Sequence, residues 1–153
     1  MSRNLSIHDI DKCSEHAYID VGGIKIQFVS VKHIGEIADT VAKLGIETDE
    51  ILKIFKQYDF EYLRNLTSEE SSRLIRESSE LFILEKEDIK KIREFCIEAI
   101  ARIKEVVDLS KRSKTQIVGN EFEEECYEAW GDLNPMLIMC ERALELGVRL
   151  HVA

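Results

Sequence analysis

A scarcity of helix-breaking residues is the feature that most constrains this chain, whose 153 residues include one proline, Pro135, and seven glycines. In a helix interior, proline costs about 3 kcal/mol relative to alanine and glycine costs about 1 kcal/mol. Long stretches of this sequence can therefore be helical without interruption. Apolar residues recur at intervals of three and four over most of the chain, which is the spacing of one helix face. The sequence predicts a helix-dominated fold.

The clearest departure from the helical period lies between residues 16 and 30. Apolar and polar residues alternate on both sides of Gly22 and Gly23, and two glycines supply the positive φ angles that a two-residue hairpin turn requires. We therefore predict a β-hairpin that turns at these glycines. The tail 148–152 also alternates. We expect it to form a strand that could join the hairpin and so bring the two chain ends together.

Periodicity, caps and breaks divide the rest of the chain into six expected helices. Thr67 and Glu70 have the spacing of a capping box, Pro135 suits the first position of a helix, and Gly45 and Gly147 can close helices in the left-handed conformation. The expected helices cover residues 30–44, 48–66, 68–82, 89–107, 120–131 and 135–146, with a basic loop over 110–119.

The helix expected over 89–107 has the widest apolar face, so we predict that it is the longest helix and lies at the centre of the fold. The residues expected to be buried on it are Ile92, Cys96, Ala99 and Ile103. The fold class that follows is α+β: a helix-dominated single globular domain over residues 1–153, with a small antiparallel sheet built on the N-terminal hairpin.

Composition also predicts the cellular compartment of the protein. No stretch approaches the eighteen or so apolar residues that a membrane span needs, and the first residues contain no apolar run typical of a signal peptide. We therefore expect a cytoplasmic protein. The four cysteines (Cys13, Cys96, Cys126 and Cys140) form no C-x-x-C pair, which disfavours a zinc ribbon or a thioredoxin-type site and favours reduced thiols.

Negative charge is concentrated at the C-terminal end. Residues 119–153 contain eight acidic residues and two arginines, and they account for −6 of the formal net charge of −9. Such a field repels nucleic acid and anionic lipid and attracts basic protein surfaces or cations. We therefore expect a basic protein surface as the partner, and neither nucleic acid nor a membrane.

Four acidic residues of the helix expected over 120–131 share one face, opposite Phe122, Cys126, Ala129 and Trp130: they are Glu121, Glu124, Glu125 and Glu128. A solvated helix face is the plainer interpretation, and a docking surface for a basic partner is the functional one. The predicted partner-binding residues are Glu121, Glu124, Glu125, Glu128 and Asp132. A small acidic chain of this kind fits an inhibitor or adaptor that covers a basic surface, as an immunity protein or antitoxin does.

A magnesium-dependent nucleotide hydrolase is the alternative. Residues 124–128 match the E-E-x-x-E half of the motif with which the all-α nucleoside triphosphate pyrophosphohydrolases hold magnesium, and residues 105–108 match the E-x-x-D half. Oxygen ligands from two packed helices suit Mg²⁺, and the ligands would be Glu105, Asp108, Glu124, Glu125 and Glu128. The two halves occur in the reverse order here, so we assign the chain to no family on these nine residues.

Other sites find little support. The sequence contains neither a G-x-x-x-x-G-K-[ST] loop nor a G-x-G-x-x-G turn, so neither common nucleotide site is expected. His33 and Glu36 could share a metal ion, but no second such pair completes a site. The cluster at Lys111, Arg112 and Lys114 is too short for nucleic-acid binding in so acidic a chain. We therefore predict no catalytic residue, metal or cofactor.

Overall fold

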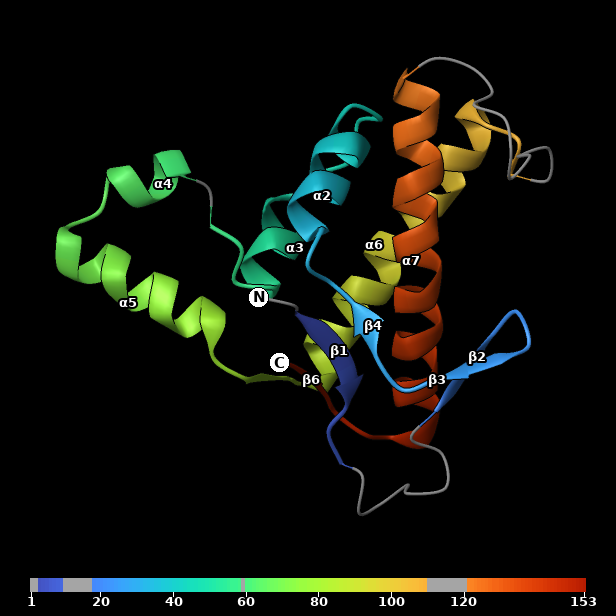
Figure 1. Ribbon diagram of the computed structural model, residues 1–153, viewed down its shortest axis with the longest axis horizontal. Helices are drawn as coiled ribbons and strands as arrows, with labels where there is room; N and C mark the ends of the chain where they lie inside the picture. The colour runs from blue at the N-terminus through green and yellow to red at the C-terminus, as the bar shows by residue number, and fades with distance from the viewer. Residues whose placement is uncertain (1–2, 10–17, 59, 110–120) are drawn as a thin grey trace.

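Two long helices form the centre of the fold in this computed structural model, which describes residues 3–9, 18–58, 60–109 and 121–153. Helix α6 (Lys86–Val106) packs against helix α7 (Glu121–Leu146) and crosses behind it diagonally in Figure 1. The predicted apolar stripe of α6 is fully buried at Ile92, Cys96, Ala99 and Ile103. The prediction of a buried face on this helix is therefore confirmed.

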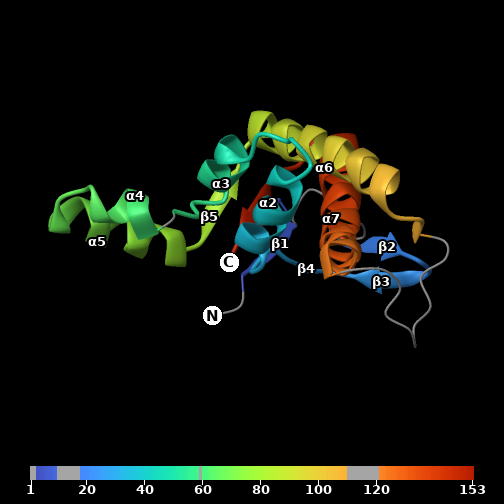
Figure 2. The ribbon, with the colours of Figure 1, turned by 90° about the horizontal axis from the view of Figure 1, so that it is seen from above.

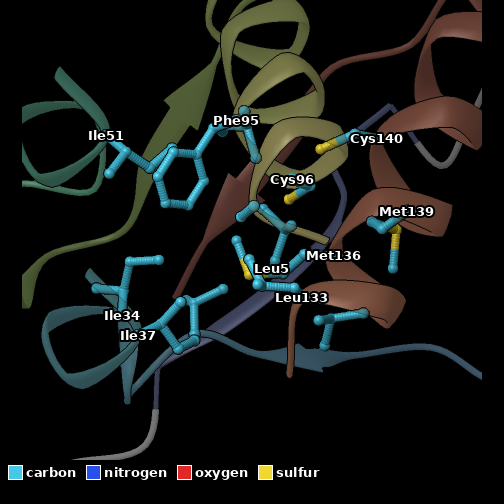
Figure 3. Close-up of a cluster of buried hydrophobic side chains, with 14 of the residues drawn as sticks. Leu5, Ile34, Ile37, Ile51, Phe95, Cys96, Leu133, Met136, Met139 and Cys140 are labelled. Atoms are coloured by element: carbon cyan, nitrogen blue, oxygen red, sulfur yellow. The ribbon is translucent and has the colours of Figure 1, made fainter. Parts of the chain in front are cut away.

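Side chains from several elements meet around this helix pair. Figure 3 shows Cys96 of α6 and Cys140 of α7 in one cluster with Leu5, which comes from the N-terminal strand. Helix α2 (Ile34–Ala42) contributes Ile34 and Ile37 to the same core. The core thus joins both ends of the chain to its centre.

A four-stranded antiparallel sheet lies against the helices, with strand order β4-β1-β6-β5. Its strands are β1 (Asn4–Ile7), β4 (Val29–Ser30), β5 (Phe82–Leu84) and β6 (Leu150–Val152). The predicted C-terminal strand exists, and its pairing with β1 brings the chain ends together as expected. The α+β class, dominated by six helices (α2–α7) with a small antiparallel sheet, is confirmed for the described residues.

The predicted hairpin is present, but it does not pair with the C-terminal strand. Strands β2 (Ile19–Val21) and β3 (Ile24–Ile26) form a separate two-stranded sheet, with Val21 opposite Ile24. Gly22 and Gly23 form its turn with φ angles of 59° and 86°. Strand β6 pairs instead with β1 and β5, because the four alternate apolar residues of β1 and β6 (Leu5, Ile7, Leu150 and Val152) all reach the core there.

Five expected helix boundaries are wrong. Helix α6 begins at Lys86, three residues before the expected start at residue 89. Helix α2 begins at Ile34, because Ser30 belongs to β4. The helix expected over 48–66 is broken into α3 (Asp49–Ile54) and α4 (Phe60–Arg64), with Lys56 between them at a φ of 54°. Helix α5 (Ser68–Ser79) ends before Phe82, which lies in strand β5. The basic loop expected over 110–119 lies outside the described residues.

The last boundary error concerns Pro135, and it also makes the prediction that α6 is the longest helix wrong. The two helices expected over 120–131 and 135–146 are one continuous helix, α7, whose 26 residues make it longer than the 21-residue α6. Pro135 lacks the N–H that would bond to the Gly131 carbonyl. Burial on both sides of this position offsets that loss, at Leu133, Met136, Met139 and Cys140.

Candidate partner-binding groove

An open groove lies between helices α2 and α7. Its volume is about 730 Å³. Figure 2 shows α7 between α2 on one side and the β2–β3 hairpin on the other. The described residues that line the groove belong to the two helices and to the positions just before and after α2: His33, Glu36, Ile37, Asp39, Thr40, Lys43, Glu125, Glu128, Ala129, Gly131 and Asp132.

Helix α7 supplies three of the five predicted partner-binding residues to this groove: Glu125, Glu128 and Asp132. They lie on one helix face because they are three and four residues apart. The apolar side chains Cys126 and Ala129 are buried, as expected for the docked side of the helix. Glu121 and Glu124 lie in the first turn of α7 and do not line the groove.

Helix α2 supplies two further carboxylates, Glu36 and Asp39, which the sequence interpretation did not include. Both are exposed, on the opposite side of α2 from the buried Ile34 and Val41. Their three-residue spacing could have marked an acidic face on this helix. The sequence contained no signal that this face would lie across from α7, because that depends on packing between distant segments.

Two basic side chains accompany the five carboxylates of the groove. Lys43 Nζ lies 3.2 Å from Glu125 Oε2 and therefore bridges the end of α2 to α7. The same ammonium lies 5.7 Å from the centroid of the Phe122 ring. At the other end of α2, His33 Nδ1 lies 3.3 Å from Glu36 Oε2. Five carboxylates against one lysine and one histidine leave the groove strongly acidic.

The electrostatics of the groove act most clearly on Asp132. Partial burial raises the pKa of its carboxyl, and the nearby Glu36 raises it further, whereas His33 and Lys32 lower it. A carboxylate that has lost part of its hydration and lies near another negative charge is stabilised by an incoming cation. The groove can therefore attract and hold a positively charged side chain.

The carboxylates of the alternative magnesium site do not converge. Among the residues that the structure describes, no group of three or more His, Cys, Asp or Glu side chains is arranged to hold a metal ion. The end of α6 does approach α7, where the Tyr127 hydroxyl donates a 2.8 Å hydrogen bond to the backbone carbonyl of Asp108. That contact joins the two helices through a phenol and a backbone group rather than through paired carboxylates.

The described cysteines, Cys96, Cys126 and Cys140, are buried free thiols. Burial raises the pKa of the Cys96 thiol to about 12 and that of Cys140 well above its usual value. Burial and the neighbouring Glu125 also raise the pKa of Cys126. Because the thiolate is the nucleophile, these three residues are poor candidates for catalysis. Their role is to fill the core between the helices.

Comparison with known proteins does not identify a relative. Neither family models nor curated proteins nor solved structures gave a match to this chain. None of the helices in the described ranges combines the length and apolar character that a bilayer span requires.

Proposed function

We propose that this protein binds a basic protein through the acidic groove between α2 and α7, and that it acts as an inhibitor or adaptor that covers a basic surface. The observation that carries the proposal is the meeting of carboxylates from two separate segments. Glu36 and Asp39 come from α2, whereas Glu125, Glu128 and Asp132 come from α7, and all five line one groove. The predicted docking face of α7 is thus extended by a second helix.

The shape of the groove supports a protruding basic side chain as the group it receives. Gly131 lines the groove, and a Cβ at this position would meet no atom within 4 Å, so the wall is open at Gly131. The buried Ala129 and Ile37 give the groove a partly apolar lining. A lysine or arginine could place its methylene groups there and its charge among the carboxylates.

The proposal includes a cytoplasmic location, since the buried free thiols suit a reducing compartment. It also includes the expectation that the protein binds neither nucleic acid nor anionic membranes, because its negative field repels both. In such a binding protein, charges at the rim mainly accelerate association and make it dependent on salt.

The test uses a fluorescent lysine-rich peptide as the probe and measures its binding by anisotropy between 20 and 150 mM NaCl. Over this range the electrostatic screening length falls by about a factor of two to three. The groove variant combines Glu36→Gln, Asp39→Asn, Glu128→Gln and Asp132→Asn and leaves the Lys43–Glu125 pair intact. The matched control replaces four exposed carboxylates of α6: Glu87→Gln, Glu94→Gln, Glu98→Gln and Glu105→Gln. Both variants change the net charge equally.

We expect the groove variant to weaken binding at least tenfold, or about 1.4 kcal/mol, and the α6 variant to weaken it by much less. Gly131→Leu should also weaken binding, because it fills the groove without changing its charge. Equal losses in the two charge variants, together with full binding by Gly131→Leu, would show that net charge alone attracts the peptide. The groove would then have no specific role.

A further inference from the structure

Two histidines from opposite ends of the chain meet on the four-stranded sheet. Leu5 and Ile7 of β1 point to the core, and the alternation of the strand places Ser6 on the other face. There Ser6 lies directly opposite His151 of β6. The backbone N–H of His8 donates a 2.9 Å hydrogen bond to the Arg149 carbonyl, so the pairing of β1 with β6 extends to His8 and places it beside His151.

The two imidazole rings have the spacing of neighbouring ligands of one metal ion. His8 Nδ1 and His151 Nδ1 are 3.3 Å apart, the ring centroids are 5.3 Å apart and the ring planes are at 85°. Two imidazole nitrogens that bind a tetrahedral ion at about 2.0–2.1 Å are separated by about 3.3–3.4 Å. Both nitrogens could therefore bind one ion without a change in the backbone.

Ser6 holds His151 in the orientation that such a site needs. His151 Nε2 lies 2.9 Å from Ser6 Oγ. When neutral His151 carries its proton on Nε2, this N–H donates to Ser6 Oγ, and Nδ1 keeps a lone pair on the side of His8 Nδ1, where it could bind a metal. Metal-binding histidines commonly use their second N–H in this way. Partial burial and the neighbouring His8 both lower the pKa of His151, which favours the neutral ring.

Asp9, the residue after His8, is held by Arg149. Its Oδ2 accepts hydrogen bonds from the backbone N–H and the Nε of Arg149 at 2.8 and 3.2 Å, and its Oδ1 accepts one from Nη2 at 3.0 Å. The residue after His8 is thereby tied to the segment that leads into β6. Asp9 is engaged with Arg149, so among the described residues His8 and His151 are the ligands that this geometry offers.

We propose that His8 and His151 chelate one late first-row divalent metal ion, such as Zn²⁺, Ni²⁺ or Cu²⁺. Imidazole suits these ions, whereas Mg²⁺ and Ca²⁺ prefer oxygen ligands. The ion would join the first strand to the last through residues 143 positions apart. Because the two rings meet only when β1 pairs with β6, the ion would bind the native state alone and would stabilise the fold.

The test titrates the full chain, without a histidine tag, with NiCl₂ and follows its melting temperature. A ligand that binds only the native state raises the melting temperature. We expect a rise that EDTA reverses, that His8→Gln and His151→Gln each abolish, and that the remote variant His33→Gln retains. MgCl₂ at the same concentration should give no rise. Ser6→Ala should weaken nickel binding roughly tenfold or more, the usual effect of losing a partner of a metal-bound histidine.

A second measurement on the wild type keeps the proposal testable even if the histidine variants do not fold. Paramagnetic Ni²⁺ should broaden the ring proton signals of His8 and His151 in the NMR spectrum before it affects those of His33. A nickel-induced rise that survives His8→Gln or His151→Gln would overturn the proposal. So would the absence of selective broadening at these two rings.

Discussion

Helices α7 and α5 are stabilised in opposite ways. Helix α7 contains Pro135 in its interior, yet it continues for 26 residues because the residues around the proline are buried against α6 and the core. In α5, none of the side chains that the structure describes is buried. Its order depends on local interactions, above all the hydrogen bond from the Glu70 amide to Thr67 Oγ1. Tertiary packing overrides a helix breaker in one helix, and local signals define the other.

The same contrast separates two parts of the molecule. Figure 1 shows α4 and α5 extending away from the α6–α7 pair; we call residues 60–81 the arm and the rest of the described chain the body. At the base of the arm, Lys56 Nζ lies 4.6 Å from the centroid of the Phe82 ring. Isolated helices shorter than about 12–15 residues are marginal in water, and α5 has 12. We therefore expect the arm to open without unfolding the body.

The largest effect should come from the core of the body. Ile103 is fully buried on α6, so Ile103→Ala should lower the free energy of unfolding by about 2–5 kcal/mol, the range for such truncations in a packed core. Urea unfolding followed by circular dichroism measures this change. The matched control is Ile75→Ala in the arm, where the side chain is 55% exposed. The control should change the free energy of unfolding by less than about 0.5 kcal/mol.

A loss below about 1 kcal/mol for Ile103→Ala, or similar losses for the two variants, would contradict the division into body and arm. Such results would mean either that the α6 face is less tightly packed than the full burial of Ile103 indicates or that the arm contributes to the same cooperative unit.

The same contrast explains which parts of the fold could be predicted from the sequence. Features defined by a few neighbouring residues were predicted correctly: the Gly22–Gly23 turn, the Thr67 cap and the glycine at the end of α7. The break after α3 was not, because no glycine or proline marks it. Lys56 takes its positive φ beside tertiary contacts, including a 2.6 Å hydrogen bond from the Arg3 guanidinium to the Phe55 carbonyl.

The candidate groove could also be predicted only where it depends on neighbouring residues of one helix. The acidic face of α7 could be predicted from spacing within one helix. Its extension by Glu36 and Asp39 could not, because it depends on how α2 packs against α7. The pairing of His8 with His151 depends on the register of two strands at opposite ends of the chain. Strand β1 has only four residues, too few to establish an alternating pattern in the sequence.

A smaller effect, of opposite sign, should come from Pro135. Replacing an interior proline by alanine removes a helix penalty of about 3 kcal/mol, while the more flexible unfolded chain offsets up to about 1 kcal/mol of that gain. We therefore expect Pro135→Ala to stabilise the protein by about 2 kcal/mol in urea unfolding. Asn134→Ala is the control, since it changes helix propensity by less than about 0.7 kcal/mol without restoring a backbone donor. A destabilised Pro135→Ala protein would mean that the surrounding core is shaped to the proline ring.

The smallest effect concerns the cap of the arm, and it distinguishes local from global stability. Thr67→Ala removes the side chain that accepts from the Glu70 amide, a change that costs about 1 kcal/mol of helix stability. If the arm opens before the body, this loss should appear as faster hydrogen exchange of the α5 amides, roughly fivefold for 1 kcal/mol. The urea midpoint of the whole protein should hardly move.

Thr67→Asp retains a capping oxygen and should restore slow exchange. Ser72→Ala, at an exposed position within α5, should slow exchange slightly because alanine favours helix. If the free energy of unfolding from urea fell by as much as the free energy of opening from α5 exchange, the arm and the body would form one cooperative unit. Helices α5 and α7 would then differ in their contacts but not in their stability.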